Sequence, residues 1–417
     1  MSRKLKVGIS QGDPNGIGPE IIIKSIMTEG VTDLFTPVVF TDSNFFKNSL
    51  KNFVINDGES RLPEINVART FNEIKEGKIN VIEIPGPPEL KPGEVIRSAG
   101  LNARLSLQKA VEALKKRQVD VLVTAPICKE NIIDEEFPFA GHTDYLEKEA
   151  GEGYKSLMIL FDNTMRVALV TTHIPLKEIS ETLTVEEIVK KARVFDKSLR
   201  MDFGVVRPRI AILSLNPHNG EGGVLGREEE EIITPAIEEL RKEGVLAFGP
   251  FATDGFFGDG MQYKFDGVLA MYHDQGLTPF KTLSGKTGVN FTAGLPFVRT
   301  SPDHGTAFEI AGKGIADEIS MRNAIYEAID IYRRRDSFKK FSANPLKQYA
   351  EIHPEREERQ EGENRRPIPE RQFNRGEKQE GENQRQTQDR QFPREEKPEN
   401  NNGNIGSDFD NTQNIIQ

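Results

Sequence analysis

The chain has 417 residues, enough for two or more domains, and its 55 basic and 65 acidic residues give a net charge of −10. This charge argues against a general nucleic-acid-binding protein, which needs a basic face to neutralise phosphates. The only cysteine, Cys128, leaves no disulfide or cysteine-based zinc site within one chain, and the lack of a signal peptide or bilayer-length apolar run predicts a cytoplasmic protein.

The first third of the chain alternates short β-branched runs with longer amphipathic stretches. Strands are predicted at residues 5–10, 36–42, 79–84 and 119–126. Helices are predicted between them at residues 18–27 and 99–118. This alternation is typical of an α/β protein with a largely parallel sheet, in which chemistry collects in loops after the strands.

The middle of the chain begins with a predicted hairpin, residues 156–173, that turns at Asp162-Asn163. A helix follows at 184–199, with Thr184 as its N-cap and Glu187 three residues later. Further strands are predicted at 207–217 and 265–274, and further helices at 227–244 and 321–335. Both strands run directly into loops that contain histidine.

From about Leu346 the sequence turns to Glu, Arg, Gln, Asn and Pro. "QEGEN" occurs at Gln360 and Gln379, and "RQF" at Arg371 and Arg390, each pair offset by 19 residues. A repeat of this length can indicate a solenoid, but it lacks apolar positions to stack. We therefore predict that residues 343–417 form a low-complexity, disordered tail.

Three histidines follow predicted strands: His173, His218 and His273. Each alone could be a turn residue, but strand ends of one sheet converge, and three imidazoles suit a catalytic divalent ion. Asp254 and Asp274 are candidates to orient a metal-bound imidazole, although Asp254-Gly255 could equally be a simple turn. His142 and His304 also lie in loop-like contexts.

Two further motifs are candidates for binding anions. "QGDPNGIGPEI", residues 11–21, matches neither a dinucleotide fingerprint nor a P-loop, and predicts a sharp strand-to-helix connection with N–H groups open to an anion. Lys281, Asn290 and Arg299 lie in mostly apolar surroundings, where an unpaired charge is costly. They suit either a phosphorylated substrate or a structural salt bridge.

Several of these motifs, in this order, resemble the 4-hydroxythreonine-4-phosphate dehydrogenase family of vitamin B6 biosynthesis, over about residues 5–340: "GDPNGIGPE", "FAGHTDYL", "TTHIPL", "LNPHNGEGG", "YHDQGLTPFK" and "GVNFTAGLPFVRTSPDHGTAFEIAGKG". The segment 303–317 also resembles the cofactor loop of isocitrate and isopropylmalate dehydrogenases. The resemblance implies two α/β/α domains with a cleft between them. Their expected bounds are about 1–130 with 300–342, and about 131–299.

The resemblance also implies roles for single residues. The metal ligands would be His173, His218 and His273, with His273 supplied by the neighbouring subunit of a homodimer. The substrate contacts would be His142, Thr143, Lys281, Asn290 and Arg299. NAD would contact Gly305, Thr306 and Ala307. Asp144 and Asn219 depart from the residues usual in the family, without removing a ligand.

The implied reaction is NAD-dependent oxidation of 4-phosphooxy-L-threonine with decarboxylation to 3-amino-2-oxopropyl phosphate. It would use a divalent ion, with zinc, magnesium, manganese and cobalt all compatible. A dehydrogenase for D-threonate or D-erythronate 4-phosphate shares these motifs and is the nearest alternative. Two alternatives come from other classes of protein. One is a non-enzymatic binding protein that uses the tail to recruit a partner, and the other is a zinc hydrolase.

Overall fold

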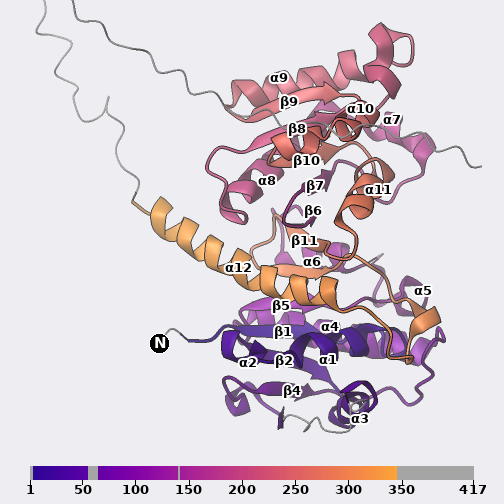
Figure 1. The fold of residues 1–417 in the computed structure, drawn as a ribbon, viewed down its shortest axis with the longest axis vertical. Helices are drawn as coiled ribbons and strands as arrows, with labels where there is room; N and C mark the ends of the chain where they lie inside the picture. The colour runs from indigo at the N-terminus through magenta and orange to yellow at the C-terminus, as the bar shows by residue number, and fades with distance from the viewer. Residues whose placement is uncertain (1–2, 55–63, 140, 345–417) are drawn as a thin grey trace, which may run out of the picture. The chain divides into compact units, whose positions relative to one another are not determined.

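The computed structural model describes residues 3–54, 64–139 and 141–344, so the predicted tail from residue 345 onward lies outside the described residues. The described chain has the predicted α/β architecture, built on one 12-stranded sheet (Figure 1). Among the described residues, no helix is long and apolar enough to cross a membrane.

The sheet order is β3-β4-β2-β1-β5-β12-β11-β6-β7-β10-β8-β9. Its strands are β1 (Lys6–Ser10), β2 (Thr36–Thr41), β3 (Ile65–Ala68), β4 (Ile79–Glu83), β5 (Val121–Thr124), β6 (Leu157–Phe161), β7 (Arg166–Leu169), β8 (Arg209–Leu213), β9 (Leu246–Phe251), β10 (Gly267–Ala270), β11 (Val289–Ala293) and β12 (Arg299–Pro302). Pairing is parallel except at β6–β7, β6–β11 and β11–β12. The hairpin predicted around Asp162 is confirmed as the β6–β7 pair.

The described helices are α1 (Gly18–Ile26), α2 (Val31–Leu34), α3 (Ser43–Val54), α4 (Arg97–Lys115), α5 (Lys129–Ile132), α6 (His142–Ala150), α7 (Ile179–Thr182), α8 (Val185–Met201), α9 (Thr234–Lys242), α10 (Thr253–Gly258), α11 (His273–Ser284) and α12 (Ile319–Ser342). The predicted cap of α8 is confirmed, because the Thr184 side chain accepts the N–H of Glu187. The predicted helix at 227–244 starts instead with a π-helical turn, Glu229–Ile233, before α9.

The two faces of the sheet are packed differently. On one face, α1, α8, α9 and α12 cover a single apolar core that runs through the whole sheet. On the opposite face there are two separate apolar cores, one that includes residues of α4 and α6 and one that includes residues of α10 and α11.

The six strands β1–β5 and β12 form one half of the sheet, and the other six form the second half. The proposed division into two subdomains stays a prediction.

The glycine-rich motif is buried beneath its neighbours. The N–H of Asp13 donates to Pro126 O, and the N–H of Ile17 donates to Thr306 O. A Cβ on Gly12 would lie 2.4 Å from Pro126 O, so only glycine fits this close approach. The expectation of an anion-binding loop is therefore wrong for these two N–H groups, because they already donate within the fold.

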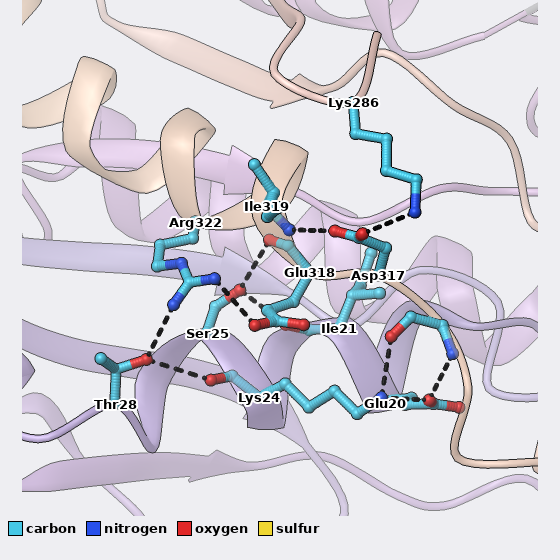
Figure 2. Close-up of polar contacts among 11 residues, drawn as sticks. Glu20, Ile21, Lys24, Ser25, Thr28, Lys286, Asp317, Glu318, Ile319 and Arg322 are labelled. Atoms are coloured by element: carbon cyan, nitrogen blue, oxygen red, sulfur yellow. Dashed lines mark hydrogen bonds and ion pairs between the residues drawn. The ribbon is translucent and has the colours of Figure 1, made fainter.

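Helix α1 also holds the segment that leads into α12, as Figure 2 shows. The Lys24 ammonium donates to the carbonyl oxygens of Gly314 and Ala316 at 2.9 and 2.8 Å. Buried Glu20 accepts from Lys24 and from the N–H of Ala316, both at 2.7 Å. The motif thus supports the 303–317 segment at both ends, through Ile17 and through Glu20.

Candidate functional site

A cavity of about 450 Å³ lies on the face of the sheet with the two separate cores, lined by α6 from one side and α11 from the other. Its floor includes β6 and β11, with Leu160 and Asn290 side by side in adjacent strands. The structure brings together in its lining most residues that the sequence singled out: His142, Thr143, His173, His273, Lys281, Asn290, Arg299 and Gly305.

Arg299 is the most unusual of these residues, because it is buried without a counter-ion. Its guanidinium, in a residue 2 % exposed, donates to the hydroxyls of Thr124 and Thr292 at 2.6–3.1 Å. Within the described ranges, no carboxylate lies within 4.0 Å of it. Burial lowers the pKa of Arg299 to about 9. A cation in this setting is stabilised when an anionic ligand enters the cavity.

Other polar atoms at the cavity also lack protein partners. His142 begins α6, and its buried Nε2 has no hydrogen-bond partner among the described residues. The same holds for Oδ1 of Asn290 and Nε2 of His304. Burial, followed by the charge of Arg299, lowers the pKa of His142 well below its usual value. His142 is therefore neutral near pH 7 and can donate to or accept from a ligand.

This lowered pKa predicts how stability depends on pH. The pKa of His142 is lower in the folded protein than in the unfolded chain, so below about pH 6.5 the unfolded chain binds a proton that the folded protein does not. The free energy of unfolding therefore falls as the pH drops below that value, and His142 causes no such loss above it. His142→Gln is expected to reduce proton uptake on unfolding near pH 5.5 by up to about one proton. Denaturant melts from pH 7 to pH 5 measure this, and equal slopes for variant and parent would contradict it.

Two of the candidate metal ligands are neighbours. The rings of His173 and His273 have centroids 5.9 Å apart, a separation at which two imidazoles can share one ion. Burial, and then the charge of Lys129, lowers the pKa of His173, which favours its neutral, ligating form. Nδ1 of His273 lies 2.6 Å from the Asp274 carboxylate, as expected for a partner that orients the ring.

His218 does not join this pair within one chain. It is exposed on the Pro217–Gly223 turn and is absent from the cavity lining. Among the described residues, no three His, Cys, Asp or Glu side chains are grouped to hold a metal. Asp254, in α10, is exposed and also lies outside the lining. One chain thus brings together two of the three candidate metal ligands.

The turn that carries His218 has an uncommon backbone. Every residue from 218 to 223 has a positive φ, including His218, Asn219 and Glu221, and such values cost about 1–2 kcal/mol for each non-glycine residue. Asn tolerates this conformation well, which accounts for Asn219. Buried Glu229 holds the approach to the turn by accepting the N–H groups of Leu215 and Asn216, both at 2.8 Å.

One buried amide connects the loops that carry the candidate ligands. Oε1 of Gln275 accepts the N–H of Met271, and its Nε2 donates to Ser214 O and to Thr253 Oγ1. Met271 O in turn accepts from the Thr171 hydroxyl at 2.7 Å. The capture of the Met271 N–H helps to end β10 before His273. The prediction that residues 265–274 form one strand is therefore wrong at its end, where His273 begins α11.

The predicted cofactor residues are divided between two environments. Gly305 lines the cavity, whereas Thr306 and Ala307 do not. Thr306 O accepts the N–H of Ile17, and a Cβ on Gly16 would lie 2.9 Å from that oxygen. The NAD contacts stay a prediction.

Several lining residues were absent from the sequence-based set. They are Lys129, Asp144, Glu147, Ser156, Lys191, Asp303 and His304. His304 was noted only for its turn-like context. Lys191 lies in a helix with many charges, so nothing in its spacing distinguished it from a solvent-facing lysine.

Comparisons with known proteins give a consistent result. The family model described as "Pyridoxal phosphate biosynthetic protein PdxA" matches residues 33–328. A 4-hydroxythreonine-4-phosphate dehydrogenase of Bacteroides thetaiotaomicron is 48% identical over 364 residues, 84% of this chain and 94% of that protein. An Oceanobacillus iheyensis protein named "Putative D-threonate 4-phosphate dehydrogenase" is 38% identical over 333 residues, 79% of this chain and 99% of that protein.

A solved structure shows the same similarity. The crystal structure of the 4-hydroxythreonine-4-phosphate dehydrogenase from Klebsiella pneumoniae aligns with a TM-score of 0.68 at 37% identity. The alignment covers 80% of this chain and 98% of that one.

Proposed function

The chain belongs to the PdxA family of pyridoxal phosphate biosynthetic proteins, and we propose that it is a dehydrogenase that oxidises 4-hydroxythreonine 4-phosphate. The observation that carries this proposal is Arg299, a buried cation without a carboxylate partner in the described chain, at the wall of a cavity that already contains two adjacent histidines. An anionic substrate completes this arrangement, and the cavity is of the size typical for a small-molecule ligand.

In the proposed reaction, the C3 hydroxyl is oxidised and the resulting β-keto acid loses CO2 to give 3-amino-2-oxopropyl phosphate. NAD, when bound, would accept the hydride that leaves C3. Arg299 and Lys281 bind anionic oxygens of the substrate, and Arg suits bidentate contact. Nε2 of His142 and Oδ1 of Asn290, which have no hydrogen-bond partner among the described residues, form hydrogen bonds with the same ligand. These contacts orient the substrate, which is a large share of what an active site contributes.

A divalent cation held by His173 and His273 would supply a Lewis acid that lowers the pKa of the substrate hydroxyl. We infer that the third protein ligand comes from a second copy of the chain. The resemblance assigned this role to His273, but the adjacency of His173 and His273 in one chain favours His218 instead. Its exposed turn presents the imidazole outward, where a second copy can meet it.

A D-threonate 4-phosphate dehydrogenase is the second candidate, because one relative at 38% identity carries that name. Both substrates have a phosphate at one end and a carboxylate at the other, so the cations of the cavity fit either one. They differ at C2, where the B6 precursor has an amine and the sugar acid a hydroxyl.

A substrate panel tests the proposal and separates the two candidates. NADH formation is measured with 4-hydroxythreonine 4-phosphate, D-threonate 4-phosphate and D-erythronate 4-phosphate, before and after metal removal by a chelator. We expect the first to have the highest kcat/KM, and its turnover to disappear with the metal and return on re-addition. A higher kcat/KM for either sugar acid would favour the second candidate. No NADH from any of the three would contradict both.

A further inference from the structure

One part of the cavity wall is formed by residues that the sequence did not single out. Three side chains belong to it: Ser156 just before β6, Glu147 of α6 and Lys191 of α8. Helix α8 packs its apolar side, with Ile188, into the core on the other face of the sheet. Lys191 nevertheless lines the cavity, beside the start of β6.

Lys191 has no acidic partner in this part of the wall. Its ammonium makes one long hydrogen bond, 3.4 Å, to Ser156 O, and no carboxylate of the described residues lies within 4.0 Å of it. The nearby Glu147 carboxylate is already used, since it accepts from the N–H and hydroxyl of Ser156 and from Lys155 at 2.6–3.0 Å. Burial lowers the pKa of Lys191, although the more distant carboxylates of Glu187 and Glu147 act in the opposite direction. An anion that binds to this half-buried ammonium would offset the remaining cost of its burial.

The neighbouring lysine shows the contrast. Lys190 points to the surface and pairs with Glu187 at 2.8 Å, one turn earlier in α8. It does not line the cavity. The two adjacent lysines of α8 therefore have different surroundings. Lys190 has an acidic partner at the surface, whereas Lys191 lies at the wall of the cavity and forms no ion pair with the described residues.

The register of the floor places Lys191 relative to the other cations. Asn290 pairs with Leu160, Thr292 with Met158, and Ala293 with Leu157, so Ser156 lies past the last pair. Arg299 donates to Thr292 and so lies between the level of Asn290 and that of Ser156. The distance along the strands from Asn290 to Ala293 is about 10 Å. This is comparable to the length of a substrate with an anionic group at each end.

We propose that Lys191 is a further substrate-binding residue that, together with Arg299, binds one anionic group of the substrate at the Ser156 end of the cavity. The chemical class of this group is an oxyanion, either the phosphate or the carboxylate. The identity of the substrate rests on the proposed function, whereas the proposal that an oxyanion binds here rests on the residues that line the cavity.

The test compares Lys191→Met with Lys190→Met, two changes of the same size in adjacent residues. Lys191→Met is expected to raise KM for the phosphorylated substrate about ten- to hundred-fold, the range for a lost charge-assisted hydrogen bond, with kcat within about threefold. Lys190→Met should leave KM within about twofold. Lys191→Arg keeps the charge and should recover part of the affinity. Equal KM values in the two methionine variants would overturn the proposal.

A binding measurement keeps the result independent of turnover. Inorganic phosphate and L-threonine are each titrated while the melting temperature is followed. Loss of the phosphate-induced shift in Lys191→Met assigns the phosphate to this end, and loss of the threonine-induced shift assigns the carboxylate. Equal shifts in both methionine variants with both ligands would overturn the proposal. If the parent turns over no substrate, the proposed function fails, and these shifts still decide the role of Lys191.

Discussion

Replacement of Arg299 by methionine is expected to lower kcat/KM for the phosphorylated substrate by about two to three orders of magnitude, and to leave the folded protein at least as stable as the parent. The loss of activity follows because the oxyanion of the substrate would enter a buried site without its cation. Stability is retained because the unliganded protein keeps Arg299 buried with only two threonine hydroxyls as partners. Removing this charge removes a desolvation cost.

The chain offers a matched control for this variant. Arg335 is also a buried arginine, but it is paired with the fully buried carboxylate of Asp202. Arg335→Met leaves that carboxylate without its cation, which is expected to cost about 3–5 kcal/mol of stability. Steady-state kinetics and denaturant melts on both variants provide the measurement. A destabilisation by Arg299→Met as large as that by Arg335→Met would show that Arg299 is structural and would remove the main support for the proposed function.

His218→Ala is expected to reduce metal-dependent turnover at least about a hundredfold, because a metal site with two protein ligands holds its ion weakly. The fold should be kept, since His218 is exposed and its side chain packs into no core. Metal affinity, measured by competition with a chelator, should fall together with turnover. Unchanged metal affinity in this variant would exclude His218 as a ligand.

On the proposal that a second copy of the chain completes the site, mixed dimers decide which histidine comes from the neighbouring subunit. If His218 acts in trans while His173 acts in cis, a mixture of His173→Ala and His218→Ala chains restores one complete site in each mixed dimer. A mixture of His173→Ala and His273→Ala should then stay inactive, because both residues belong to the same subunit's half of the site. The reverse pattern would return the role to His273, as the resemblance implied.

Much of the fold could be read from the sequence, because the signals were local. β-branched runs mark strands, and Thr184 with Glu187 marks the start of α8, since each depends on residues close together in the chain. The end of β10 was misjudged for the opposite reason. The N–H of Met271, just after β10, donates to the side chain of Gln275, and that amide is held in turn by Ser214 O, which is distant in sequence. A local sequence pattern does not report the second contact.

The site residues divide in the same way, into those that a local sequence motif marks and those that only contacts between distant segments reveal. Motif matching selected residues that do share one cavity, such as His142, Lys281 and Asn290. It could not select Lys191, because a lysine in a charged helix has the same local pattern whether it faces solvent or a ligand. The strand-to-helix position of the glycine-rich motif suggested N–H groups open to an anion, whereas the N–H groups of Asp13 and Ile17 donate to carbonyl oxygens of the fold.

By itself, the sequence determined the α/β class, the family and a core of residues that meet at the cavity, because these follow from residue type and order. Only the tertiary structure decided which charges lack a partner. Arg299 is buried and Lys191 is half-buried, and neither forms an ion pair with a carboxylate of the described residues. That absence depends on segments distant in sequence, since the energy of a charge is set by everything packed around it.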